Sequence, residues 1–326
     1  MNVLITGASG FIGSFLCEAS LDKGWDTWAA LRATSSKRWL KYEGLQFIEL
    51  DLANPSALNS QLRALTSHLS PLTSHLSKWD VVIHAAGATK CVKQEEFDFH
   101  NYLCTRHLVE ALKAADMMPR QFIYLSSLSA TYGSTYGNSK LKTERWLHET
   151  LDGSETGLVV FRPTGVYGPR EKDYFMMVQS IGRHVDIAVG FEPQVLTFVY
   201  VKDLVGAIIS AIEKGVMEGT FNVTDGGEYS SRAFSDLIQQ EMGVKHVVHV
   251  TAPLWVLKAV SVVSEEIGKQ TGRPSTLNRD KYKMMAQRDW RCDISGMIDV
   301  LGYHPQWNLA RGVKETIAWY KENGWI

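Results

Sequence analysis

The sequence predicts an α/β fold built on a doubly wound parallel sheet, and three observations favour it. Short apolar runs alternate with segments of helical spacing through about residue 125, which indicates successive βαβ units. Three glycines, Gly7, Gly10 and Gly13, stand between the first apolar run and the first helical pattern. The chain of 326 residues is also long enough for one large or two medium domains with a substantial core.

The first element is a β-prone run at Val3–Ile5, too short for a helix, and helical spacing begins at Phe11. Between them, Gly7 allows a sharp turn, Gly10 allows backbone to approach a pyrophosphate, and Gly13 allows the helix to pack closely on the strand. Phosphates would lie at the N-terminus of this helix, where free N–H groups and the positive dipole end point. The alternative is an ordinary glycine-containing loop.

The second strand, Thr27–Leu31, ends at Arg32, with Lys37 and Arg38 close behind and no acidic residue at the strand end. A carboxylate there would accept hydrogen bonds from the adenosine ribose of NAD, whereas arginine suits the 2′-phosphate of NADP. NADP is therefore favoured over NAD, although a solvated charged loop accounts for the same residues.

A third strand at Leu45–Leu50 leads to Asp51 and Leu52. At the carboxyl edge of the sheet, the Asp51 side chain could meet the adenine amino group. It could equally be the carboxylate at the N-terminus of a helix that begins near Asn54 and Pro55.

The fourth and fifth strands also end in residues suited to a ligand. Val81–Ile83 is fully apolar, as expected in a buried parallel sheet, and small residues follow it at Ala85, Ala86 and Gly87. Phe122–Leu125 ends in a pair of serines. Ligands bind doubly wound sheets at the carboxyl ends of the strands. The following residues fall there: Gly7, Asp51, Gly87, Ser127.

The chemistry is predicted from Tyr136 and Lys140, which are four residues apart at the start of a helical pattern and so share one helix face. An ammonium group stabilises a phenolate, so Lys140 would lower the pKa of Tyr136 and bind the ribose. Tyr136 would then pass a proton to or from a substrate oxygen that Ser127 hydrogen-bonds. The alternative is a surface helix with an ordinary Tyr and Lys.

Composition excludes several other classes of protein. A net charge of −1 without a basic tract argues against nucleic acid and anionic polymers as partners. The four cysteines are far apart, which suggests neither a zinc site nor disulfides but free thiols in a reducing compartment. The six residues Leu65–Ser70 recur at 72–77, and their histidines, His68 and His75, read as copies within that repeat rather than as ligands, so no metal is expected. No leader segment precedes the first strand, so a cytoplasmic protein without a membrane span is expected.

At this point the sequence resembles the extended short-chain dehydrogenase/reductase superfamily, also called the epimerase/dehydratase family. The resemblance covers nearly the whole chain and rests on these segments: 6–13, Asp51 and Leu52, 84–87, Asn101, Ser126 and Ser127, 136–140, 162–169, 198–204, 301–303 and 312–319. It implies a Rossmann-type domain at 1–165, to which 197–225 returns, and a smaller C-terminal α+β substrate domain at 166–196 and 226–326. It also implies a homodimer through two helices.

The resemblance further implies a division of labour among the site residues. Catalysis falls to Ser127, Tyr136 and Lys140, and Asn101 contacts a small-molecule substrate. The expected cofactor-binding residues are Gly7, Ser9, Gly10, Phe11, Ile12, Gly13, Arg32, Asp51, Leu52, Ala85, Ala86, Gly87, Tyr136, Lys140, Pro163 and Val166.

Two departures from the family pattern bear on function. Tyr136 follows Ser127 by only nine positions, where members have a much longer segment that helps to wall the substrate pocket, so Ser126 and Ser129 also remain candidates. Tyr132 is a second tyrosine, but no lysine follows it by four. Relatives that act on nucleotide sugars carry Arg-Asp where this chain has Leu196 and Thr197. A pyrophosphate would need cations from elsewhere, which favours a less charged substrate, as in the branch that resembles 3β-hydroxysteroid dehydrogenases and dihydroflavonol reductases.

These observations lead to an NAD(P)-dependent oxidoreductase that moves a hydride between nicotinamide and a secondary alcohol or ketone. The first alternative is a nucleotide-sugar epimerase or dehydratase with tightly bound NAD, and the second is a non-catalytic dinucleotide-binding protein. An apolar helix at 253–267, with Trp255, Leu257, Val260, Val263 and Ile267, is expected to line the substrate domain. The helix is too short and too polar to span a bilayer. A membrane-surface role, or a place at the mouth of an apolar-substrate site, is the alternative.

Overall fold

The computed structural model describes residues 1–68, 78–272, 275 and 277–326, and these form two compact units. The first unit comprises Met1–Arg162 and Val205–Phe221, and the second comprises Pro163–Leu204 and Asn222–Ile326. The returning segment Val205–Phe221 lies inside the expected range of 197–225. Most of the repeat at 65–77, including His75, lies outside the described residues.

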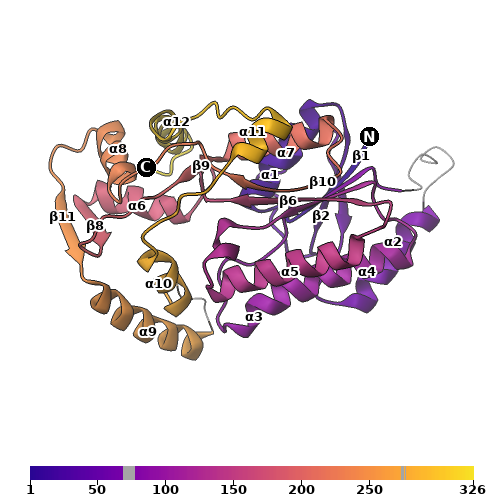
Figure 1. The fold of residues 1–326 in the computed structure, drawn as a ribbon, viewed down its shortest axis with the longest axis horizontal. Coiled ribbons are helices and arrows are strands. Elements are labelled where there is room, and N and C mark those ends of the chain that lie inside the picture. Colours follow the sequence, from indigo (N-terminus) through magenta and orange to yellow (C-terminus); the bar gives the residue numbers. More distant parts are fainter. Residues whose placement is uncertain (69–77, 273–274, 276) are drawn as a thin grey trace. The chain divides into compact units, whose positions relative to one another are not determined.

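The first unit is organised by a seven-stranded sheet in the order β10-β6-β5-β4-β1-β2-β3 (Figure 1). Its strands are β1 (Asn2–Thr6), β2 (Asp26–Leu31), β3 (Gln46–Glu49), β4 (Val81–His84), β5 (Gln121–Leu125), β6 (Gly157–Pro163) and β10 (Glu218–Val223). All neighbours from β3 to β6 pair in parallel. Because β1 has β2 on one side and β4 on the other, the chain reverses direction across the sheet at β1. The expected doubly wound parallel sheet is confirmed.

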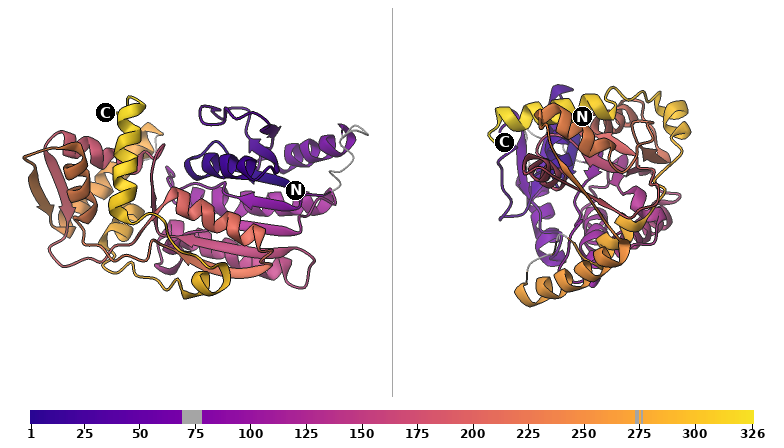
Figure 2. Two further views of the ribbon diagram at one scale, coloured as in Figure 1. Left: turned by 90° about the horizontal axis from the view of Figure 1, so that it is seen from above. Right: turned by 90° about the vertical axis from the view of Figure 1, so that its left-hand side faces the viewer.

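Helices cover both faces of this sheet (Figure 2). The helical elements of the first unit are α1 (Phe11–Asp22), α2 (Pro55–His68), α3 (Glu95–Phe97), a π-helical turn (Asp98–Leu103), α4 (Cys104–Ala114), a 3-10 turn (Leu128–Thr131), α5 (Thr135–Leu151) and α7 (Val201–Glu213), of which the residues up to Leu204 belong to the second unit. On one face, Leu58 of α2, Leu108 of α4 and Leu147 of α5 are fully buried in one core with strand residues such as Val82. On the other face, Lys23 and Glu213 form an ion pair between the ends of α1 and α7. Burial on both sides explains why the central strands are continuously apolar.

The second unit contains two small parallel sheets and six helices within its described residues (Figure 1). Its strands are β7 (Gly165–Tyr167), β8 (Val185–Val189), β9 (Phe198–Tyr200) and β11 (Val248–Ala252), paired β7 with β9 and β8 with β11. Its helices are α6 (Asp173–Gly182), α8 (Ala233–Met242), α9 (Leu254–Thr271), α10 (Arg279–Ala286), α11 (Ser295–Leu301) and α12 (Leu309–Glu322). The core is aromatic: Tyr167 lies edge-on to Phe198 and Phe234, and Tyr320 of α12 is fully buried.

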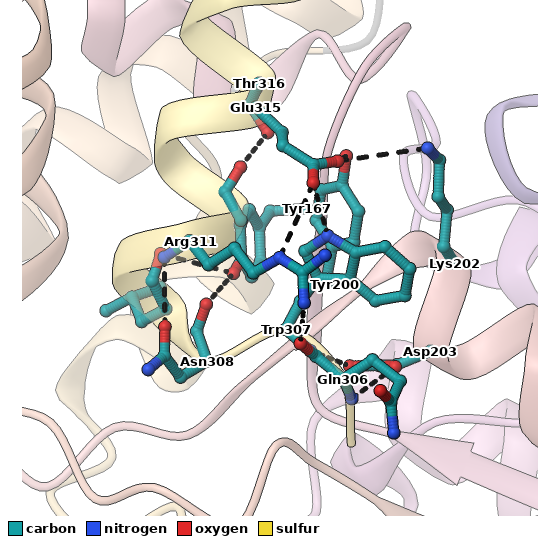
Figure 3. Close-up of polar contacts among 12 residues, drawn as sticks. Tyr167, Tyr200, Lys202, Asp203, Gln306, Trp307, Asn308, Arg311, Glu315 and Thr316 are labelled. Atoms are coloured by element: carbon teal, nitrogen blue, oxygen red, sulfur yellow. Dashed lines mark hydrogen bonds and ion pairs between the residues drawn. The ribbon is translucent and has the colours of Figure 1, made fainter.

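The C-terminal segment of this unit is held by Asp203 (Figure 3). The two carboxylate oxygens of Asp203 accept hydrogen bonds from the backbone N–H groups of Gln306 and Trp307, at 2.9 and 3.0 Å. Gly312 of α12 lies against Tyr167, whose hydroxyl would stand 2.1 Å from any Cβ at that position. The motifs at 198–204 and 312–319 therefore make contacts that stabilise the structure of this unit.

Most of the apolar residues of helix α9 are exposed. Leu257 is buried, but Trp255, Val260, Val263 and Ile267 are between 48 % and 72 % exposed, so these four side chains do not pack into the core of the second unit. None of the helices in the described parts of the chain is long and apolar enough to cross a membrane.

Candidate functional site

The turn between β1 and α1 is shaped to receive an anion. Gly7 has a φ of +68°, and a Cβ there would lie 2.7 Å from backbone atoms of Ala85 and Ala86. Gly10 is the N-cap of α1, and its N–H donates to the Gly7 carbonyl at 2.9 Å. No side chain caps the helix, and its first turn holds no acidic residue. Uncovered N–H groups with a positive dipole end fit a pyrophosphate.

The ends of β1 and β4 are joined beside this turn. Thr6 Oγ1 accepts a hydrogen bond from the Ala86 N–H at 3.3 Å and lies 2.7 Å from Nδ1 of His84. His84 Nε2 lies 2.8 Å from Oγ1 of Thr105, and burial lowers the pKa of His84 to about 3, helped by the charge of Lys140. A Cβ at Gly13 would lie 2.1 Å from the Gly7 carbonyl oxygen, which is the close helix packing that the sequence predicted.

At Gly87, the segment after β4, which is expected to bind the cofactor, lies close to side chains of the expected catalytic site. A Cβ on Gly87 would lie 2.7 Å from Oδ1 of Asn101 and 3.2 Å from Nζ of Lys140. Asn101 is fully buried in the π-helical turn, where Oδ1 accepts from the Ala88 N–H and Nδ2 donates to Ser139 Oγ at 2.9 Å. These contacts give Asn101 a structural role at the site, and its contact with substrate stays a prediction.

The short link between Ser127 and Tyr136 is a single 3-10 turn followed by a cap. Ser127 is half-buried, and its hydroxyl accepts from the Ser129 N–H at 3.2 Å. Ser134 then caps α5 by accepting the Gly137 N–H at 2.9 Å. A Cβ at Gly137 would overlap the Ser129 carbonyl oxygen at 1.9 Å, so the glycine lets α5 pack directly on this turn.

Tyr136 and Lys140 lie on the buried face of α5. The Tyr136 side chain is 9 % exposed, and its ring centroid is 5.9 Å from that of Phe97. Lys140 Nζ donates to the Leu125 carbonyl at 2.9 Å and lies 4.9 Å above the Tyr124 ring. Burial lowers the pKa of Lys140 to about 8, against the opposing effect of Glu144. The ammonium is thus held at the end of β5, and Lys140 follows Tyr136 by one turn of α5.

Glu144 was not singled out from the sequence, although it continues the spacing of four that begins with Tyr136 and Lys140. It is 2 % exposed, and its carboxylate accepts hydrogen bonds from Arg162 and from the hydroxyl of Ser126. The Ser126 hydroxyl therefore donates its proton to Glu144, whereas the Ser127 hydroxyl accepts a hydrogen bond from the Ser129 N–H. The i, i+4, i+8 pattern is the signal that could have found Glu144.

Arg32, Asp51 and Leu52 lie at the neighbouring strand ends. Asp51 Oδ1 accepts from the Ala53 N–H at 3.1 Å, whereas Asn54 caps α2 by accepting from the Ala57 N–H at 3.1 Å. Asp51 is therefore not the cap of α2. The Leu52 carbonyl lies 2.9 Å from Nδ1 of His107. Arg32 is exposed. Across the described residues, no three His, Cys, Asp or Glu side chains gather as a metal site.

The remaining predicted residues belong to the second unit. Pro163 ends β6 and Val166 lies in β7. Between them, Thr164 Oγ1 donates to the Thr197 carbonyl at 2.8 Å, and Thr197 Oγ1 donates to the Trp290 carbonyl at 2.8 Å. The backbone of Leu196 pairs in both directions with Tyr229. The two positions that differ from nucleotide-sugar enzymes are thus occupied by an apolar residue and an internally bonded hydroxyl.

Comparison with known proteins agrees with this geometry. The model of the NAD dependent epimerase/dehydratase family matches residues 3–224. The ceramide reductase of Caulobacter vibrioides is 24% identical over 330 residues, covering 99% of this chain and 96% of that protein. The decarboxylating sterol-4-alpha-carboxylate 3-dehydrogenase of Saccharomyces cerevisiae is 20% identical, with 98% of each chain covered.

Solved structures share the fold. The UDP-glucose 4-epimerase of Thermotoga maritima, determined with UDP-glucose, superposes with a TM-score of 0.74 at 21% identity over 99% of both chains. The UDP-glucuronic acid 4-epimerase of Bacillus cereus, determined with NAD, gives a TM-score of 0.73 at 21% identity over 99% of both chains.

Proposed function

Since the chain belongs to the NAD-dependent epimerase/dehydratase family and is therefore an enzyme, we propose that it transfers a hydride between nicotinamide and a secondary alcohol or ketone. One observation carries the proposal: the ammonium of Lys140 is buried at the end of β5, 2.9 Å from the Leu125 carbonyl and four residues beyond Tyr136. A nearby cation favours the phenolate, which is the form of Tyr136 that accepts a proton.

The residues at the sheet edge fit the dinucleotide. Gly7, Gly10 and the uncapped start of α1 would hold its pyrophosphate, and Ser9, Phe11, Ile12 and Gly13 complete that turn. Bound there, the nicotinamide ring supplies the hydride acceptor or donor. Ala85, Ala86 and Gly87 leave room across the end of β4, and Asp51 and Leu52 border the adenine side. Exposed Arg32 directly follows β2, where the chain has no acidic residue to bind the adenosine ribose, and this supports NADP over NAD as the preferred form.

The chain's own residues would carry the proton. Ser127 hydrogen-bonds the substrate oxygen, and Tyr136 exchanges a proton with that oxygen while its charge changes. Lys140 stabilises the phenolate and binds the ribose, with its Nζ fixed by the Leu125 carbonyl. We further propose that the first unit binds the cofactor and that Pro163 and Val166 contact the nicotinamide end of the cofactor. The second unit would bind the substrate. We also propose that the enzyme is a cytoplasmic homodimer.

The substrate is proposed to lack a pyrophosphate. Leu196 supplies no cation, and the hydroxyls of Thr164 and Thr197 are committed to each other and to the Trp290 carbonyl. A doubly charged group would need charge-assisted hydrogen bonds that these positions cannot make. Two full-length relatives of this chain are named as a ceramide reductase and a sterol dehydrogenase, which supports an apolar alcohol or ketone.

A nucleotide-sugar epimerase or dehydratase is the second candidate, favoured by the likeness to UDP-glucose 4-epimerase in both curated and solved relatives. The two candidates differ in net redox change. The test is to follow cofactor oxidation or reduction with a panel of sterols, long-chain keto-amides and small ketones, and in parallel to assay UDP- and dTDP-sugars for conversion without net redox change. Net turnover with the first panel is expected. Sugar-nucleotide conversion with NAD that survives purification would replace the proposal by the second candidate.

A further inference from the structure

Helix α9 has polar residues on the side that faces the protein and apolar residues on the side that faces solvent. The residues on its protein side include the polar Ser261 and Glu265 and the small Gly268, all buried. The opposite side carries exposed apolar residues at helical spacing, called here the outer stripe, with the exposed Glu266 among them: Trp255, Ala259, Val260, Val263 and Ile267. Trp255 is 72 % exposed, Val263 60 % and Ile267 56 %. Apolar area of this kind on a regular helix marks an interaction surface.

The orientation of α9 is fixed by the polar contacts of its protein side. Glu265 accepts a hydrogen bond from the Arg279 N–H at 3.0 Å and pairs with Lys269 at 3.1 Å. Arg279 is the first residue of α10, which lies alongside α9 in Figure 1. Rotation of α9 to bury the outer stripe would leave the Glu265 carboxylate without these partners, which is costly for a buried charge.

The two-stranded sheet of β8 and β11, which precedes α9, also exposes apolar residues and buries a charged one. In the β8–β11 pair, Val185 is opposite Val248 and Ile187 is opposite Val250. Ile187, Val248 and Val250 are 60 %, 64 % and 44 % exposed. Alternate residues point the other way: Asp186 is buried and bonded to Arg232 and His249. This apolar sheet face is joined to α9 by Pro253 alone.

Most exposed charged residues of the segments that carry these two surfaces are cations, of which Lys269 is paired with the buried Glu265. Within the described residues of 183–192 and 245–283, the exposed cations are Arg183, Lys245, Lys258, Lys269, Arg279 and Lys283. The exposed acids of the same segments are Glu192 and Glu266, since Asp186, Glu265 and Asp280 are buried. The chain as a whole has a net charge of −1, whereas these segments have more exposed cations than exposed acids. An apolar helix face flanked by Lys and Arg suits the boundary between anionic headgroups and acyl chains.

We propose that the outer stripe and the apolar face of β8–β11 dock this protein onto the surface of a lipid bilayer that contains anionic lipid. Charge decides between this occupant and a second copy of the chain, because two copies would bring the same cations face to face. Docking is peripheral: the stripe lies in the interface plane with Trp255 at headgroup depth. The inference goes beyond the proposed hydride transfer and does not depend on it, since binding is measured without turnover.

The test is flotation of the full chain with vesicles of phosphatidylcholine alone and of phosphatidylcholine with phosphatidylglycerol. We expect binding to the anionic vesicles, weakened by salt. The triple variant Trp255→Ser/Val263→Ser/Ile267→Ser should bind on the order of a hundredfold more weakly, because each side chain loses its apolar burial. Met176→Ser is the matched control, since Met176 is 49 % exposed on α6 and outside both surfaces, and it should bind as the wild type does.

A second arm tests the charges separately. Lys258→Gln and Lys283→Gln should each weaken binding to anionic vesicles by roughly fivefold and leave the weak binding to neutral vesicles unchanged. These exposed positions also keep the proposal falsifiable if the triple variant fails to fold. Absence of wild-type binding to anionic vesicles overturns the proposal, as does unchanged binding of a folded triple variant. A dimer that the triple variant converts to a monomer, without vesicle binding by either form, would assign the surface to a second copy instead.

Discussion

Arg162 Nε donates a hydrogen bond to the carboxylate of Glu144 at 3.0 Å. Glu144 follows Lys140 by four residues on the buried face of α5. The same carboxylate accepts from Ser126, and its charge raises the pKa of Lys140 while burial lowers it. The ion pair therefore ties the end of β6 to the helix that carries the proposed proton carrier.

Removal of this pair should be costly. Glu144→Gln leaves the guanidinium of Arg162 with a neutral partner in a largely buried position, and we expect unfolding free energy to fall by about 3 kcal/mol. Asp98→Asn is the matched control, because Asp98 pairs with Lys142 on the exposed side of the same helix, where both side chains are about half exposed; its cost should stay below about 0.5 kcal/mol. Urea unfolding measures both. Equal losses would show that burial does not distinguish the two pairs.

Lys140 makes stability depend on pH in a predictable direction. Its pKa is about 8 in the folded chain and 10.5 ordinarily, so between these values the folded chain binds fewer protons than the unfolded chain. The wild type should therefore gain stability relative to Lys140→Met as pH rises from about 8 to about 10.5, by about 3 kcal/mol in all. Below about pH 8 the difference between them should be constant. Unfolding of both proteins across this range measures it, and a difference that does not change with pH would contradict the buried ammonium.

The glycine turn can be tested with two substitutions of equal backbone strain. Gly7 and Gly24 have φ values of +68° and +69°, but a Cβ at Gly24 meets no atom within 4 Å. Gly24→Ala should cost about 1 kcal/mol of unfolding free energy for the left-handed conformation alone. Gly7→Ala adds the overlap with Ala85 and Ala86, so it should cost clearly more and weaken NAD binding. Denaturation and cofactor titration compare the two. If both variants lose the same stability and keep NAD affinity, the close approach has no role.

The sequence allowed the parallel sheet and the glycine turn to be predicted because both depend on local patterns. Val3–Ile5 was predicted as a strand from its own apolar run, and Gly7 was predicted to allow a sharp turn; the strand is buried and Gly7 has a positive φ. The hydrogen bond from Lys140 to the Leu125 carbonyl and the proximity of Gly87 to Asn101 depend on strand order instead, and neither contact was predicted.

Three features could not be predicted for physical reasons. The apolar helical pattern of α9 indicates that contact with water is unfavourable at Trp255 and Val263. It does not indicate whether these side chains pack against the rest of the protein or against another surface. The roles of Asp51 and Asn54 were also open, because either can cap a helix, and the choice depends on where α2 begins. The compact 3-10 turn after Ser127 likewise follows from packing of Gly137 on Ser129 rather than from local propensity.

The most direct measurement of the central claim is the turnover of Tyr136→Phe with the best substrate of the panel, together with its affinity for the cofactor. The substitution removes one hydroxyl and keeps the ring that packs on Phe97. We expect kcat/KM to fall by roughly 10²- to 10⁴-fold while cofactor affinity stays within about threefold of wild type. Tyr132→Phe, the control at the neighbouring tyrosine, should remain active. Near-wild-type turnover of Tyr136→Phe, or an equal loss in Tyr132→Phe, would contradict Tyr136 as the proton carrier.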